Sequence, residues 1–158
     1  MLLPNPYGDL KMDSADRSTQ KDTSSSAVTS SLIDLIARLE KATGPDRELD
    51  GDICAALGLH PDGWRRGVKE ASADAIWFDD RTRRSWSASA FTSSIDAAMS
   101  LVPEGWNRRA SETDKHWWWA ELREGYETSY NRVEIGQSPS LPVSICIAAL
   151  KARSLPAI

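Results

Sequence analysis

The sequence has few of the residues that build common catalytic and metal sites. Its 158 residues include two cysteines, Cys54 and Cys146, and two histidines, His60 and His116. The cysteines lack the close spacing of metal or redox pairs and lie in apolar, helix-like runs, so we expect reduced core residues and no metal site. A G-x-S-x-G motif and a glycine-rich phosphate loop are also lacking. We therefore predict a protein that is not an enzyme, has no catalytic residues and needs no cofactor.

Long apolar runs are lacking as well. No segment approaches the length needed to span a bilayer, and the start, Met1–Pro6, has neither the basic nor the apolar region of a signal peptide. We expect a cytoplasmic protein without membrane contact. The net charge of −4 argues against general nucleic-acid binding, since that affinity comes largely from Lys and Arg on phosphates. The arginines between positions 65 and 84 are nearly cancelled by nearby acids.

Apolar residues at helical spacing are present in four places. Residues 1–28 are rich in Ser, Thr, Asp and Lys without any period, which predicts a disordered tail before a single domain at 29–158. Helices are expected from near Thr29 to Gly44, over 46–57, after a cap at residues 92–94, and over 140–153. The last of these is apolar nearly all round, so it should be the most buried.

Two hairpins are expected between these helices. Short strands at 75–79 and 85–88 would pair so that Trp77 faces Trp86. A strand at 116–123 would pair with a segment at 124–136, with a bulge or an extra turn near Asn131. The order α-α-β-β-α-β-β-α then predicts an α+β layered sandwich, in which both hairpins form one antiparallel sheet packed with helices.

The acidic residues Glu48, Asp50 and Asp52 are the one acidic cluster of the sequence. Glu48 and Asp52 are four residues apart and would share a helical face, a spacing that suits a hard cation. Neither a histidine nor a second acidic cluster completes a site. We interpret the cluster as a solvated helix start.

Three consecutive tryptophans, Trp117 to Trp119, dominate the second hairpin. Side chains alternate along a strand, so Trp118 would face the core while Trp117, Trp119 and Arg123 share the other face. Indole rings stack on bases and guanidinium groups bind phosphate. A ligand site is therefore predicted from Trp117, Trp119, Arg123, Arg108 and Arg109.

Three interpretations of this tryptophan face remain open. The first is that a homo-oligomer sequesters a small nucleotide-type signal there. The second is a protein interface, for self-association or for capture of a host protein, because aromatic and Arg enrichment is typical of interfaces. The third is a two-sided core in which helices cover both tryptophan faces.

Three blocks of the sequence carry a family likeness. They are Leu32–Asp50, Phe91–Trp106 and Cys146–Arg153. In their residues and their order, they resemble the small phage and prophage proteins grouped as the phage ABA sandwich domain. The resemblance covers residues 31 to 153 in separate blocks and leaves out the N-terminal tail and the loop at 65–74. It implies a sandwich fold and a phage origin, and it assigns no site residue. Small phage proteins commonly act by binding, so an accessory role against host defence is a further expectation.

Overall fold

Helices and two small antiparallel sheets make up the described part of the chain. A computed structural model describes residues 21–67, 75–126 and 129–154. The α+β class is confirmed, and the order of elements is close to the predicted one. In chain order the elements are α1 (Lys21–Lys41), α2 (Arg47–Ala56), β1 (Arg65–Arg66), β2 (Ile76–Asp79), β3 (Arg84–Ser87), α3 (Ile95–Met99), β4 (Trp106–Glu112), β5 (Trp118–Tyr126), β6 (Ser129–Ser138) and α4 (Leu141–Ser154).

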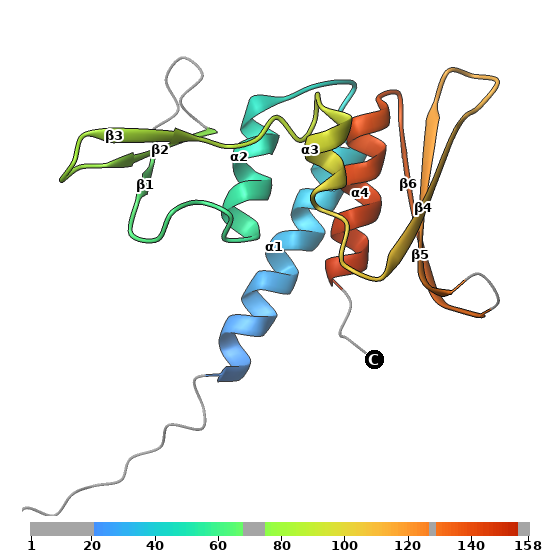
Figure 1. Cartoon of the computed structure of the whole chain (residues 1–158), viewed down its shortest axis with the longest axis horizontal. Coiled ribbons are helices and arrows are strands. Elements are labelled where there is room, and N and C mark those ends of the chain that lie inside the picture. Colours follow the sequence, from blue (N-terminus) through green and yellow to red (C-terminus); the bar gives the residue numbers. More distant parts are fainter. Residues whose placement is uncertain (1–20, 68–74, 127–128, 155–158) are drawn as a thin grey trace, which may run out of the picture.

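The central element is α4, which lies between a sheet and the other helices (Figure 1). It contacts β5 and β6 on one side and α1 and α3 on the others. All residues from Val143 to Leu150 are buried, so the prediction that this helix is the most buried is confirmed. It lies closest to the sheet at Gly136 of β6, where an added Cβ would meet the Ser144 carbonyl oxygen. Only glycine allows this approach of the two backbones.

The prediction of one sheet is wrong, because the structure has two separate sheets with orders β1-β2-β3 and β4-β5-β6. Each hairpin finds its third strand in residues that sequence patterns assigned to loops. Arg65–Arg66 pairs with β2, and the segment Trp106–Glu112, whose first four residues were expected to form a turn, is a full strand paired with β5. The two hairpins therefore belong to different sheets and do not pair with each other. The bulge near Asn131 is confirmed, since the β5–β6 register shifts at this residue.

The sheet β1–β3 extends from the body on the side away from β4–β6 (Figure 1). Trp77 of β2 anchors it, with a side chain only 2% exposed. The predicted Trp77–Trp86 pair is confirmed, with ring centroids 5.7 Å apart in an edge-on arrangement. His60 stacks on Trp77 at 5.2 Å, and the Arg66 guanidinium lies 5.5 Å from its ring. One buried indole thus ties the projecting sheet to the core.

The acidic cluster of α2 is not simply solvated, which corrects the prediction for Asp50. This carboxylate is fully buried and accepts a hydrogen bond from the Thr92 backbone nitrogen at 2.7 Å and one from Arg47 at 2.8 Å. Arg47 also donates to the Ala88 carbonyl oxygen at 2.9 Å, and the Thr92 hydroxyl accepts from the Asp46 backbone nitrogen. The cluster therefore holds α2 against the segment that follows β3.

The ends of the helices agree with the sequence except at the first. Ser94 caps α3 and Asp46 caps α2, where its side chain accepts from Glu48 and Leu49 backbone nitrogens. The first helix begins at Lys21, before the expected start near Thr29, so the last part of the predicted disordered tail is helical. Residues 1–20 of that tail lie outside the described residues. Cys54 and Cys146 are buried free thiols, as predicted.

Candidate functional site

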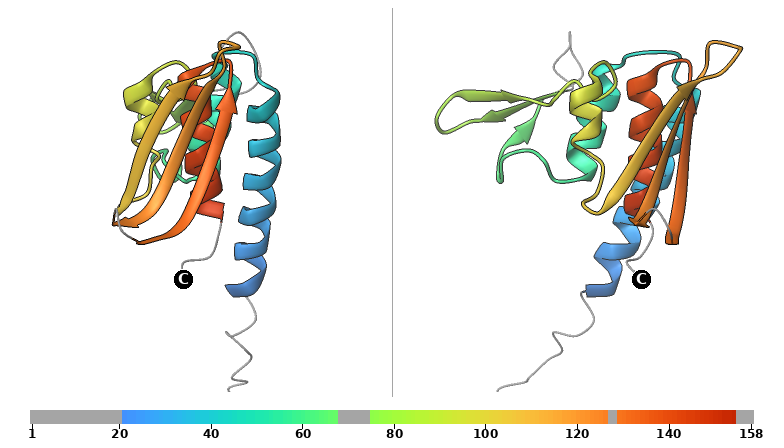
Figure 2. Two further views of the ribbon diagram at one scale, coloured as in Figure 1. Left: turned by 90° about the vertical axis from the view of Figure 1, so that its right-hand side faces the viewer. Right: turned by 45° about the vertical axis from the view of Figure 1, so that its right-hand side comes forward.

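Within the described part of the chain, helices cover the sheet β4–β6 on one face only. Opposed residues of an antiparallel pair share a face, so the strand registers assign each side chain to one face of the sheet. The inner face carries buried Ala120, Leu122, Gly136 and Ser138 against α4. In the left view of Figure 2 the sheet faces the viewer, with α4 behind it and no described helix in front. The outer face consists of Asn107, Arg109, Ser111, Trp119, Glu121, Arg123, Val133, Ile135 and Gln137.

This outer face has an apolar side and a polar side. Val133 and Ile135 of β6 are 46% and 38% exposed, and half-buried Trp119 lies on the neighbouring strand. The edge strand β4 contributes exposed polar groups, among them Arg109. Exposed β-branched residues two apart on a regular strand leave apolar surface in water, which is unfavourable in proportion to its area. The face is therefore suited to burial against another apolar surface.

One carboxylate on the outer face, that of Glu121, is almost completely buried. Glu121 is 5% exposed, between Arg109 and Ile135 as its cross-strand neighbours. The Arg123 guanidinium forms an ion pair with it along the same strand. A buried carboxylate requires a compensating positive charge. Arg123 supplies that charge to Glu121 and is also part of the outer face.

Three of the five predicted ligand residues lie together on the outer face: Trp119, Arg123 and Arg109. The fourth, Arg108, is opposite Leu122 and belongs to the other face, where it is exposed. The fifth, Trp117, precedes β5 and lies in the turn between β4 and β5, where it is 44% exposed. We predicted that these residues share one surface because we expected a single strand to run through all three tryptophans. In the structure a turn occupies the residues before Trp118, where β5 begins.

That turn is closed by backbone hydrogen bonds. The Thr113 nitrogen donates to the Trp117 carbonyl at 2.7 Å, and the His116 nitrogen donates to the Thr113 carbonyl at 3.0 Å. His116 has a φ of 58°, in the left-handed region that turns require. Beside the turn is a hollow of about 570 Å³, lined by Thr113, Asp114, Lys115, Trp117, Trp118 and Gln137. Two indoles and one ammonium group therefore meet at the end of the sheet.

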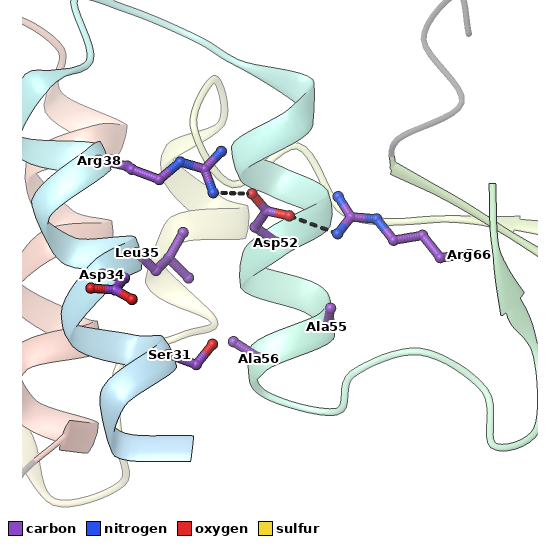
Figure 3. A pocket seen from close by; sticks show the side chains of 8 residues that line it. All are labelled: Ser31, Asp34, Leu35, Arg38, Asp52, Ala55, Ala56 and Arg66. Carbon is purple, nitrogen blue, oxygen red and sulfur yellow. Dashed lines mark hydrogen bonds and ion pairs between the residues drawn. The ribbon is translucent and has the colours of Figure 1, made fainter. Parts of the chain in front are cut away.

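A second hollow, of about 600 Å³, lies between α1, α2 and β1 (Figure 3). Its polar wall is an ion-pair chain in which Asp52 bridges Arg38 and Arg66, the latter at 2.6 Å. Arg38 also reaches Glu48 at 3.4 Å. The sequence did not indicate this arrangement, since the three elements come together only in the fold. The charges of Asp52 and both arginines are compensated, so these ion pairs connect α1, α2 and β1.

The thiols and the acidic residues offer little further chemistry. Burial raises the pKa of Cys54 to about 11 and also raises the pKa of Cys146. Both are therefore neutral thiols at physiological pH. Among residues 21–67, 75–126 and 129–154, no group of three His, Cys, Asp or Glu side chains could hold a metal ion. No helix in these ranges has the length and apolar character that crossing a membrane requires.

Comparison of the chain with known protein families, with curated proteins and with solved structures finds no match.

Proposed function

We propose that the protein acts by binding, and that the outer face of β4–β6 is the surface on which a second copy of the chain docks. The observation that carries this proposal is the exposed apolar side formed by Trp119, Val133 and Ile135 on a regular, uncovered sheet. A sheet face of this kind resembles one half of a sheet-on-sheet core, which needs a second apolar layer about 10 Å away.

A second copy supplies such a layer without any further chemistry. In a two-fold contact the same patch lies on both sides, so the apolar side of one protomer would cover that of its partner. The polar residues of β4, together with Gln137, would then form the rim, where polar groups remain solvated. The Glu121–Arg123 ion pair is already satisfied within one chain, so the contact leaves no charge unpaired. These features favour self-association over capture of a differently charged partner.

The test compares two double variants by size-exclusion chromatography with light scattering over a concentration series. Val133→Lys with Ile135→Lys places charge on the apolar side, and we expect the dimer dissociation constant to rise roughly a hundredfold. Ile33→Lys with Ile95→Lys is the matched control, because it charges two aliphatic residues of similar exposure on α1 and α3. The control should remain a dimer.

Two results would contradict the proposal. One is a wild-type chain that is monomeric at every concentration, which would leave the outer face to a different protein. The other is a dimer that survives the Val133 and Ile135 substitutions unchanged. Circular dichroism and the melting temperature of each variant would show that the fold is retained.

The hollow beside Trp117 favours a second candidate, a small nucleotide-type ligand. Trp117 would stack on a base, Lys115 would pair with a phosphate, and the Gln137 amide would contact a polar edge. Calorimetry with cyclic and linear nucleotides tests this candidate, and Trp117→Ala should abolish any heat while Trp86→Ala, on the distant sheet, should not. Absence of heat with every nucleotide and an unchanged melting temperature would eliminate it. Interference with host defence is implied by the phage resemblance and stays a prediction.

A further inference from the structure

The hairpin β2–β3 carries a concentration of arginine at its tip. The tip loop runs from Asp80 to Arg83 and is closed by a hydrogen bond from the Arg83 nitrogen to the Asp79 carbonyl at 2.8 Å. Arg81, Arg83 and Arg84 are all exposed there. Because the sheet β1–β3 projects from the body, this tip is remote from the acidic residues of the helices (Figure 1). Averaging charge along the sequence therefore hides a local excess of cations.

The two carboxylates of the hairpin accept hydrogen bonds from residues of the tip loop and of the neighbouring strand β1. Asp80 accepts two hydrogen bonds from Arg65, at 2.9 and 3.1 Å, in a fork-to-fork pair. Asp79 accepts from the Thr82 hydroxyl and from the Arg81 backbone nitrogen. The same hydrogen bonds hold the pKa of Asp79 and of Asp80 below the ordinary value, so both stay ionised while occupied. Among the described residues, no acidic side chain forms an ion pair with Arg81, Arg83 or Arg84.

Arg83 occupies a backbone conformation that glycine would adopt more easily. Its φ is 56°, in the left-handed region where a Cβ crowds the following carbonyl. His116 is the other non-glycine residue with positive φ among the described residues, but histidine is a residue type enriched in that region and arginine is not. A side chain kept at a conformational cost points to a function for that side chain.

We propose that this tip contacts the phosphate backbone of a nucleic-acid duplex. Guanidinium groups bind phosphate oxygens in a bidentate manner, and the tip presents three of them on a narrow, two-stranded ribbon. A two-stranded ribbon is also the kind of element that the major groove of a duplex admits. The shape of the hairpin thus favours a duplex over a flat membrane surface. Because the whole chain carries a charge of −4, binding is confined to the tip and depends steeply on salt.

The experiment measures fluorescence anisotropy of a labelled mixed-sequence DNA duplex as full-length protein is added. Three phosphate contacts predict a slope of about −2.7 for log affinity against log salt, which is about a 40-fold loss of affinity between about 50 and about 200 mM salt. Arg83→Gly should reduce this loss to about 12-fold, because one contact is removed. Its melting temperature should be equal to or above that of the wild type, since glycine relieves the strained φ.

Arg108→Ala is the control for net charge, because it removes one exposed arginine on the other sheet. It should leave the salt slope unchanged. Failure of the wild type to bind the duplex at about 50 mM salt would overturn the proposal. So would equal weakening by Arg83→Gly and Arg108→Ala, which would indicate a general charge effect. Equal binding of a poly-glutamate peptide or of phosphatidylserine vesicles would overturn the assignment to nucleic acid.

Discussion

Replacing Asp50 by Ala tests how the projecting sheet is held to the body. Asp50 is fully buried, and its two oxygens accept from the Thr92 backbone nitrogen and from Arg47. Arg47 in turn donates to the Ala88 carbonyl just after β3. Asp50→Ala therefore removes the group that joins α2 to the segment between β3 and α3.

The loss of unfolding free energy in Asp50→Ala comes from the two groups that lose their partner. The Thr92 N–H becomes a buried donor without a partner, which costs about 1–3 kcal/mol. The Arg47 side chain is 40% exposed and is rehydrated, so its lost ion pair adds less than about 1 kcal/mol. The total is about 1–4 kcal/mol, or a fall of about 2–16 °C in melting temperature for a chain of this length. Asp50→Asn keeps an oxygen for the Thr92 donor and should cost only about 1 kcal/mol.

Guanidinium chloride denaturation followed by tryptophan fluorescence measures these differences. Asp52→Ala is a suitable control, because Asp52 is partly exposed and bridges two arginines without accepting from a buried backbone nitrogen. Its effect should be under about 1 kcal/mol. The reasoning fails if Asp50→Ala and Asp50→Asn destabilise equally, since the orphaned Thr92 donor would then not be the cause.

Three further predictions concern close packing and burial. Gly136→Ala should lower the free energy of unfolding by about 1–3 kcal/mol in denaturant titrations, because the added methyl group meets the Ser144 carbonyl oxygen. A neutral effect would contradict the close approach of α4 and β6. Trp77→Ala should cost about 3–5 kcal/mol by the same assay, and a loss under about 1 kcal/mol would show that the projecting sheet is not anchored there. Burial raises the pKa of Cys54 from 9.0 to about 11 and so depletes the reactive thiolate. At pH 8, iodoacetamide should therefore alkylate Cys54 in the folded protein at least about a hundredfold more slowly than in the unfolded protein, as followed by mass spectrometry. Equal rates in both states would refute this burial.

Local patterns predicted most helices and one hairpin of this fold. The spacing of Leu32, Leu35, Ile36 and Leu39 predicted a buried helical stripe, and all four residues are buried. The Trp77–Trp86 pair was also predictable, since a short loop sets the register of its hairpin. These features depend on residues near one another in the chain, so periodicity and turn chemistry suffice to identify them.

The strands β1 and β4 could not be recognised in the same way. Arg65–Arg66 is too short to show a period, and Trp106–Glu112 is polar because most of its side chains are exposed. Both are edge strands whose pairing depends on the partner already present in the sheet. Missing them led to the wrong expectation of a single sheet. The burial of Asp50 was missed for a related reason, since Thr92 is far from it in sequence.

The sequence by itself determined where the four helices lie apart from the start of the first, which tryptophans pair, that both cysteines are buried, and that an aromatic strand has one core-facing side. Those outcomes follow from periods of 3.6 and 2 residues and from local capping. Only the tertiary structure decided that helices cover one face of β4–β6, that Arg108 lies on the opposite face from Trp119, that Trp117 lies in the turn before β5, and that three arginines gather at the tip of a projecting hairpin. The physical reason is that side-chain alternation assigns residues to faces, whereas the choice of which face is covered depends on where distant elements pack.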